Sequence, residues 1–287
     1  MTFPQHQRTL GKAVSCSGVG VHSGKPVNLT LKPASTNHGI VFVRTDLPDA
    51  PSIPAIFHKV IDTSMATVIG ENGVIVSTIE HLMAAFSGMG IDNARVEIDA
   101  YEMPILDGSA LRYADMIADA GEVTQDAPRC YLILKEPLHL AEGDKSVSIE
   151  PYDGYKITCT IEFPSPVIGK QSLSVDITGE TFSNEIAGAR TFGFYHELEH
   201  LKLIGLARGA TLDSGIAIDG EALMNPEGLR FDDEFVRHKL LDCIGDFSLM
   251  GLPLKAHVIT VKSGHAFNHT LLKALFENKS IWEARLL

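Results

Sequence analysis

A pattern that occurs once in each half of the chain most restricts the possible fold. Residues 22–33 (HSGKPVNLTLKP) run from a glycine-containing turn into an alternating strand and stop at a proline. Residues 142–151 (EGDKSVSIEP) repeat this order. Alternation of apolar and polar residues is typical of a strand with one buried face. Chance likeness between hairpins is the alternative, but the repeat favours two related units, each built on a sheet.

A polar stretch with a proline, residues 121–130 (GEVTQDAPRC), separates the two halves. We therefore expect domains at 1–126 and 127–287, both of ordinary domain size. Helices are expected after the strands in each half: from what reads as a capping box at 77–80 to about Gly88, over 110–120 behind Ser109, from Asp232 or Asp233 to about Met250, and over 267–278. Strands followed by helices, twice, predict an α+β fold with two sheets, each carrying helices on one face.

Composition narrows the class of protein. The chain has 287 residues and a net charge of −12, which argues against a nucleic-acid binder, because such proteins need a surplus of Lys and Arg. No apolar run approaches membrane-spanning length, and the N-terminus lacks the apolar segment of a signal peptide. The cysteines lie far apart and form no C-x-x-C motif, so they are expected to be reduced core residues: Cys16, Cys130, Cys159 and Cys243.

Residues 195–205 (YHELEHLKLIG) contain the H-E-x-x-H pattern at His196 and His200. On a helix this spacing places two imidazoles one turn apart beside a carboxylate, as in zinc proteases. A catalytic zinc site also needs a third protein ligand, and no histidine follows at the metzincin spacing. Gly205 is expected to end the helix one turn after His200. An exposed helical turn with solvated side chains is therefore favoured over a metal site.

A second Glu-His pair, Glu80 and His81, lies at the start of the helix that follows an apolar strand, where functional sites are commonly built. The competing interpretation is structural. Glu80 would then be only the capping-box glutamate, and His81 a hydrogen-bonded histidine at a helix start. The residues alone favour neither interpretation.

The segment FDDEFVRHKLLDCIGDFSLMG carries the third candidate. His238 and Asp242 are four residues apart, so both project from one helical face, and Asp246 continues that face by another turn. Two imidazoles and one carboxylate form a chemically suitable zinc set with one position left for water. A solvated His–Asp pair is the alternative, and spacing alone favours it.

The fourth candidate is His265 in KSGHAFNH, directly after Gly264. A small residue lets the backbone approach a ligand closely, and a loop histidine can reach into a cleft as an acid or a base. An ordinary surface histidine is equally consistent with this pattern.

Taken together, these stretches resemble the UDP-3-O-acyl-N-acetylglucosamine deacetylases, zinc amidases of lipid A synthesis in Gram-negative bacteria. The matching segments occur in family order from residue 7 to about 283: QRTL, SGVGVHSGK, STIEHLMAA, GIDNARVEI, EMPILDGSA, ARTFGF, NPEGLRFDDEFVRHKLLDCIGD and KSGHAFN. The resemblance implies two βααβ domains packed with helices between the sheets. It also implies an insert in each domain, the second of which, at about 190–220, forms a passage for the acyl chain.

The resemblance implies a site shared by both halves of the chain. His81, His238 and Asp242 would hold one catalytic zinc ion, with Fe²⁺ as the alternative ion in vivo. The family positions that correspond to His196 and His200 are not ligands, so H-E-x-x-H would be a decoy.

The resemblance also implies the roles of the catalytic residues. Glu80 would take the proton of a zinc-bound water, and Thr191 would stabilise the oxyanion. His265, oriented and kept charged by Asp246, would protonate the leaving amine. Glu80 acting as both base and acid stays open.

For the substrate, the resemblance implies that Lys239, which also belongs to the catalytic group, and Lys145 contact the diphosphate. Glu162 and Phe163 would contact uridine. Apolar side chains would line the acyl passage, although plain core packing competes with that interpretation for each of them: Met65, Phe192, Phe194, Leu201 and Ile216.

One segment departs from the family pattern. Familiar members read Gly-Gly-Ser after the helix of the second insert, whereas this chain reads Arg208-Gly209-Ala210-Thr211. Alanine tolerates positive φ poorly, so the replaced glycine is expected to have left room for a neighbour. We therefore expect Ala210 to narrow the acyl passage and Arg208 to face solvent.

Two other functions compete with the deacetylase: a metalloprotease that uses 196–200, and a nucleotide-sugar binding protein without catalysis. The favoured expectation is a cytoplasmic monomer whose partner is a small UDP-linked acylated amino sugar, without nucleic acid and without stable membrane insertion.

Overall fold

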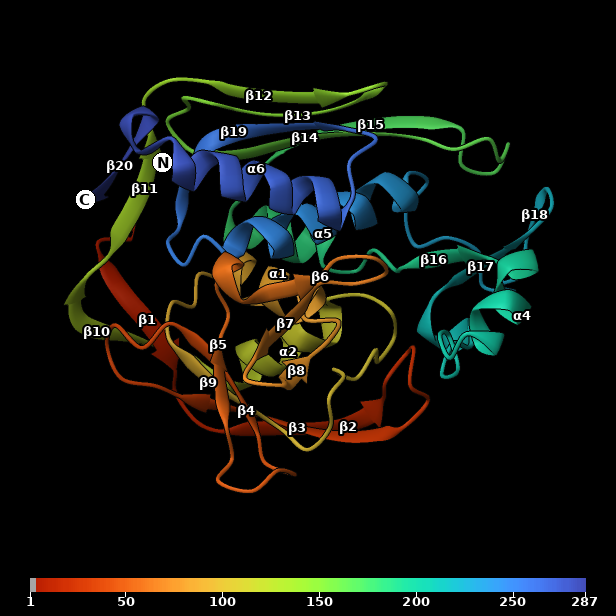
Figure 1. Ribbon diagram of the computed structural model, residues 1–287, viewed down its shortest axis with the longest axis horizontal. Helices are drawn as coiled ribbons and strands as arrows, with labels where there is room; N and C mark the ends of the chain where they lie inside the picture. Colours follow the sequence, from red (N-terminus) through yellow and green to blue (C-terminus); the bar gives the residue numbers. More distant parts are fainter. Residues whose placement is uncertain (1–3) are drawn as a thin grey trace.

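The computed structural model describes residues 4–287 and has an α+β architecture. Two sheets form the outer layers, and the main helices lie between them (Figure 1): α1 (Glu80–Met89), α2 (Leu111–Ala120), α5 (Glu234–Ser248) and α6 (His265–Glu277). The predicted fold, two sheets with helices on their inner faces, is confirmed.

The two sheets share one topology. The first has the order β2-β3-β9-β4-β5, in which only β4 and β9 pair in parallel. The second contains β12-β13-β19-β14-β15, in which β14 and β19 are the corresponding parallel pair. The strands are β2 (Val14–Val19), β3 (Pro26–Pro33), β4 (Ile40–Arg44), β5 (Ser52–Pro54), β9 (Ala94–Ile98), β12 (Leu138–Glu142), β13 (Lys145–Glu150), β14 (Tyr155–Glu162), β15 (Lys170–Asp176) and β19 (Leu254–Val261). The repeat read from the sequence is therefore a repeat of whole sheets.

The alternating segments form β3 and β13, as predicted. In β3, the apolar residues Val27, Leu29 and Leu31 are at most 1% exposed, while Asn28 between them is exposed. In β13 the same alternation buries Val147 and Ile149. Both inner faces thus present apolar side chains to the helical layer, which is what closes the core.

The segment 121–130 is a strand and not a loop between domains. β10 (Glu122–Pro128) pairs antiparallel with β1 (His6–Leu10), and β11 (Cys130–Leu134) follows almost at once. β11 joins the second sheet through β19 and β20 (Trp282–Leu286). Polar side chains on an exposed strand pair produced the same composition as a linker. The division at 126/127 stays a prediction.

The first helix differs from its prediction. No side chain caps α1, whose N-cap residue is Ile79, and Thr78 before it has a left-handed backbone with φ 61°. That conformation breaks the geometry that a capping box needs, so the predicted capping box is wrong. The helix continues one residue past the expected Gly88 and ends at Gly90, whose φ of 75° favours glycine.

The other helix ends lie within two residues of their predictions. Ser109 accepts a hydrogen bond from the N–H of Leu111 at the start of α2. Asp233 is the N-cap residue of α5, and α6 starts two residues before the expected 267.

Helices α1 and α5 cross at very short range. A Cβ atom at Gly245 of α5 would lie 2.1 Å from the backbone carbonyl oxygen of Glu80 in α1. Real Cβ atoms do not approach other atoms this closely, so no larger residue fits here without a shift. Glycine at 245 therefore sets the distance between the two helices. Since α1 and α5 carry the candidate site residues, this contact also positions the site.

Each half carries an insert, as the family resemblance implies. The first is a small sheet of β6 (Val60–Asp62), β7 (Val68–Glu71) and β8 (Val74–Val76). The second contains β16 (Phe192–Phe194), α4 (Tyr195–Leu203), β17 (Ile216–Asp219) and β18 (Ala222–Leu223), and projects at one end of the molecule (Figure 1).

Candidate active site

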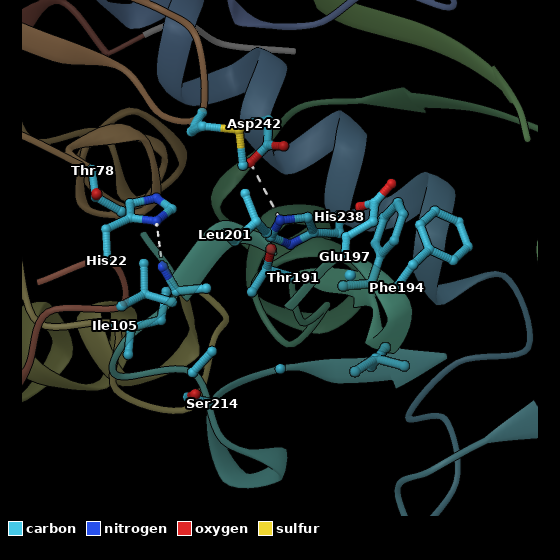
Figure 2. A pocket seen from close by; sticks show the side chains of 18 of the residues that line it. His22, Thr78, Ile105, Thr191, Phe194, Glu197, Leu201, Ser214, His238 and Asp242 are labelled. Carbon is cyan, nitrogen blue, oxygen red and sulfur yellow. Dashed lines mark hydrogen bonds and ion pairs between the residues drawn. The ribbon is translucent and has the colours of Figure 1, made fainter. Parts of the chain in front are cut away.

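A cavity of about 660 Å³ lies where the two halves meet the second insert. Its wall combines the start of α1, one face of α5, the start of α6 and the inner side of 191–217. Figure 2 shows His238 and Asp242 joined on α5, and Thr191, Phe194 and Leu201 on the part of the cavity wall that the second insert contributes. The cavity lining is mainly apolar but includes polar and charged side chains such as His238, Asp242 and Lys145, which is the usual build of a small-molecule site.

Three buried side chains from α1 and α5 form a candidate metal centre. One ligand atom each from His81, His238 and Asp242 lies within 4.8 Å of the others. Asp242 Oδ1 is 3.7 Å from His81 Nε2 and 3.4 Å from His238 Nε2. In the part of the chain that the structure describes, no second cluster of this kind is found. The i, i+4 spacing on α5 and the helix crossing at Gly245 bring the three together.

The protonation of this cluster suits a cation. His238 Nδ1 lies 3.0 Å from the backbone oxygen of Ala189, and donating there leaves the lone pair of Nε2 facing Asp242. Burial, reinforced by the neighbouring His238, lowers the pKa of His81 to about 3, so its ring is neutral. Asp242 Oδ1 is buried without a hydrogen-bond partner in the structure. The two imidazole nitrogens and this carboxylate oxygen each offer an electron pair, and together they fit a divalent ion.

Lys239 contacts the second oxygen of Asp242. The distance from Lys239 Nζ to Asp242 Oδ2 is 2.9 Å. Burial opposes the charge of Asp242, but Lys239 and the nearby imidazoles hold the pKa of the carboxyl well below its usual range. Oδ2 is thus occupied, and only Oδ1 is available to an ion. Asp242 therefore competes with the diphosphate, the predicted partner of Lys239, for the Lys239 ammonium group.

Glu80 lies beside the cluster and is not part of it. Its Oε2 accepts the backbone N–H of Thr67 at 3.0 Å, and its Oε1 is 3.9 Å from His265 Nε2. Burial raises the pKa of Glu80 to about 7, so the carboxyl group gains and loses a proton near neutral pH. The capping-box interpretation of Glu80 fails with the capping box itself.

His265 is held from behind by Asp246. His265 Nδ1 lies 2.8 Å from Asp246 Oδ2 and 3.0 Å from Oδ1. Burial opposes a charge on His265, but the Asp246 carboxylate prevails and raises the pKa of the imidazole to about 10. The ring is therefore cationic at neutral pH, and its Nε2 faces Glu80 across the cavity floor. The surface-histidine alternative is wrong, because the His265 side chain is only 13% exposed.

Thr191 lines the same cavity as His238 (Figure 2). Its backbone N–H donates to Gly108 and its carbonyl oxygen accepts from Ile216, which fix the segment between the first half and the insert. Within residues 4–287 its hydroxyl has no hydrogen-bond partner, which leaves that group available inside the cavity.

The remaining predicted contacts fall into two groups. Seven lie on the cavity wall: Met65, Lys145, Phe192, Phe194, Leu201, Ala210 and Ile216. Glu162 pairs with Lys262 at 2.7 Å, and Phe163 packs against Phe192 and Phe194 with ring centroids 5.5 and 6.2 Å apart. Neither Glu162 nor Phe163 lines the cavity, so they could meet only a part of a ligand that extends beyond it.

The H-E-x-x-H segment forms α4, as expected, and Gly205 follows its end with φ 90°. His196 and His200 are both exposed, and neither joins a metal cluster within the described chain. His196 lies 5.7 Å from the Phe194 ring. The motif is a solvated helical turn, so the metalloprotease interpretation is wrong.

Two residues of the site were missed from the sequence. Thr67 contacts Glu80, Asp246 and His265, and Asn268 Nδ2 donates to Asp246 Oδ2 at 2.8 Å. Asn268 stands in the quoted KSGHAFNH segment, three residues after His265, so its spacing on α6 was a usable signal. Thr67 had none, since it comes from a loop of the first insert.

Comparison with known proteins identifies the family. The model of the UDP-3-O-acyl N-acetylglycosamine deacetylase family matches residues 7–277. This chain belongs to that family. A deacetylase of the same description from Myxococcus xanthus is 51% identical over 278 residues, which are 97% of this chain and 88% of the relative.

Other deacetylases of this name give the same result. The protein from Syntrophotalea carbinolica is 46% identical across 97% of this chain and 90% of its own length. The protein from Anaeromyxobacter dehalogenans is 47% identical across 93% and 86%, respectively. The likeness to these deacetylases thus extends over nearly the whole chain and includes both halves.

Proposed function

We propose that this chain hydrolyses the N-acetyl group of UDP-3-O-acyl-N-acetylglucosamine with one zinc ion held by His81, His238 and Asp242. The reaction is that of the family to which the chain belongs. The observation that supports the metal assignment is the unsatisfied Oδ1 of Asp242 between two neutral imidazoles. Zinc suits two nitrogens and one oxygen with a fourth position open, and Fe²⁺ is the other ion to test.

A divalent ion held by these three residues would lower the pKa of a water molecule and polarise a carbonyl group. In this proposal Glu80 accepts the proton of the attacking water through Oε1, because its other oxygen is occupied by the N–H of Thr67. Its pKa of about 7 matches a base that must work near neutral pH. The free hydroxyl of Thr191 is available to donate to the acetyl oxygen as negative charge develops there.

In this proposal His265 gives a proton to the leaving nitrogen. The amine leaves readily only when protonated, and His265 is cationic because Asp246 holds its Nδ1–H. Its Nε2 and Glu80 Oε1 are 3.9 Å apart, so base and acid border the same space. Glu80 passing its own acquired proton to the amine is the second route.

The apolar part of the cavity suits the acyl chain. Phe192, Phe194 and Leu201 line it from the second insert, and Met65 faces it from the first half. Lys145 on the cavity wall would supply a cation for the diphosphate, and Lys239, which also lines the cavity, is the second candidate. No helix in the described chain has the length and hydropathy to span a bilayer. We propose a cytoplasmic enzyme that acts as a monomer.

The direct test is release of acetate from the UDP-linked acylated sugar before and after dialysis against a chelator. Loss of acetate release on metal removal, with recovery on addition of Zn²⁺ or Fe²⁺, is expected. Acetate release that survives complete metal removal would exclude the metal-dependent mechanism. Binding of the sugar without any release would instead favour the non-catalytic binding protein.

A further inference from the structure

Thr67 occupies an unusual position between the two proton-transfer groups. It lies just before β7 of the first insert, and it is 2% exposed. Its backbone contacts Glu80, and its side chain contacts Asp246 and His265. Within residues 4–287, no other residue combines a backbone hydrogen bond to the Glu80 side chain with a side-chain hydrogen bond to Asp246. A single residue of the insert therefore connects α1 with α5 and α6.

The backbone hydrogen bond from Thr67 determines which carboxylate oxygen of Glu80 is left to take part in the reaction. The N–H of Thr67 donates to Oε2 at 3.0 Å, and this bond fixes the rotation of the carboxyl group. Oε1 is then directed toward His265 Nε2, at 3.9 Å. That separation is too long for a hydrogen bond, but a reacting atom could contact both groups.

The side-chain contact determines the orientation of the acid. The Thr67 hydroxyl has one hydrogen, which it donates to Asp246 Oδ1 at 2.6 Å. Toward His265 Nδ1, at 3.3 Å, it can then act only as an acceptor. Asn268 holds Oδ2, so both carboxylate oxygens are fixed and the Nδ1–H of His265 has one preferred direction. The imidazole plane follows, and with it the position of Nε2.

We propose that Thr67 is a positioning residue that fixes the proton acceptor Glu80 and the proton donor His265 relative to each other. This inference rests on the proposed function, because it assigns Thr67 a part in the same reaction. The alternative is a purely structural role, in which Thr67 satisfies the buried carboxylate of Asp246 and contributes only to folding. The two differ in what a lost hydroxyl changes: the geometry of catalysis, or stability alone.

The test compares Thr67→Val with Thr67→Ser. Valine keeps the branched shape and the N–H that holds Glu80 but removes the hydroxyl, and serine restores the hydroxyl. Thr9→Val is the matched control, because the Thr9 hydroxyl is also buried and bonded, to Asn93 and Ala34, far from the cavity. Each variant is assayed for thermal stability, bound metal, kcat and KM with the UDP-linked acylated sugar.

Thr67→Val is expected to bind metal normally, to match Thr9→Val in stability, and to lose about tenfold to a hundredfold in kcat with KM unchanged, since small misplacements are costly. Thr67→Ser should recover most of kcat. An unchanged kcat in Thr67→Val, or a loss that Thr9→Val shares, would overturn the proposal.

A second measurement does not depend on turnover. In chain labelled with ¹⁵N-histidine, the Nδ1 proton of His265, assigned with His265→Ala, should exchange faster and shift in Thr67→Val but not in Thr9→Val. An unchanged resonance would also overturn the proposal. If wild-type chain released no acetate, the proposed function would fail, while this resonance would still decide whether Thr67 orients His265.

Discussion

Glu80 Oε1 and His265 Nε2 face each other at 3.9 Å, one from α1 and the other from the start of α6. The pKa of the carboxyl group is raised to about 7 and that of the imidazole to about 10. Between these values Glu80 is an anion and His265 a cation, which is the state in which one can accept and the other donate a proton. This is the protonation state that the proposed acid–base mechanism requires.

The rate of deacetylation should therefore show a bell-shaped pH dependence. Activity rises with pH as Glu80 loses its proton and falls as His265 loses its own. A bound divalent ion adds positive charge that lowers both pKa values, so the limbs should lie at or below about pH 7 and about pH 10. Profiles of kcat/KM for wild type and His265→Ala check this. The scheme with two residues is wrong if the variant keeps the wild-type rate and basic limb.

Glu80→Gln should keep its bound metal and lose catalysis. Glu80 is not among the three candidate ligands, and the amide cannot accept the proton of the attacking water. A general base contributes about 10²- to 10⁴-fold, so kcat should fall by that order. Metal analysis and acetate release on the same sample measure both. Parallel loss of metal and activity would instead make Glu80 a ligand.

Removal of a ligand should act differently from removal of the base. His81→Ala, His238→Ala and Asp242→Ala should each lower bound metal and activity together, because a three-ligand site tolerates no loss. His200→Ala is the control, since His200 is exposed on α4, and it should change neither. Metal lost in the His200 variant but retained in the His238 variant would reverse the assignment.

Gly245→Ala adds only a methyl group, but it should be among the most destabilising glycine-to-alanine substitutions in this chain. The new Cβ would lie 2.1 Å from the Glu80 carbonyl oxygen, so α1 and α5 must move apart. Overpacking of this kind costs about 1–3 kcal/mol or more in the free energy of unfolding. Urea unfolding measures the cost, and metal affinity should fall with it. Gly169→Ala, where a Cβ would meet nothing within 4 Å but φ is 59°, separates backbone strain from collision.

Ala210→Gly should shift the preference for acyl-chain length. Ala210 lines the cavity and does not have a positive φ, while Arg208 is exposed, both as expected from the sequence. One methylene of mismatch in an apolar pocket is worth about 1–3 kcal/mol, so longer chains should gain relative to shorter ones. Relative kcat/KM across a chain-length series tests this, with bound metal as the control. Identical ratios for the two proteins would leave Ala210 as a tolerated substitution.

The sequence predicted what depends on local periodicity. The alternation around Leu29 and Val147 identified strands with one buried face, and the i, i+4 spacing of His238 and Asp242 placed both on one side of α5. Such patterns depend on neighbours within one element, so they survive without knowledge of the tertiary fold.

Contacts between residues that are distant in the sequence could not be predicted in this way. H-E-x-x-H on α4 has the same kind of spacing as the α5 pair, yet within the described residues no third ligand joins it, and its histidines are solvated. The capping box failed because Thr78 adopts a left-handed backbone at the edge of the cavity. Thr67 reaches Asp246 only through the packing of the first insert on α5, which no sequence spacing encodes.

The repeated sheets have a consequence for how the enzyme matures. The candidate ligands come from the corresponding helices of the two repeats, one between β8 and β9 and the other between β15 and β19. Either repeat could assemble its own sheet first, but neither alone offers a complete set of donors. Metal capture should therefore be a late event, following the docking of the repeats, and a metal-sensitive signal would time that docking during refolding.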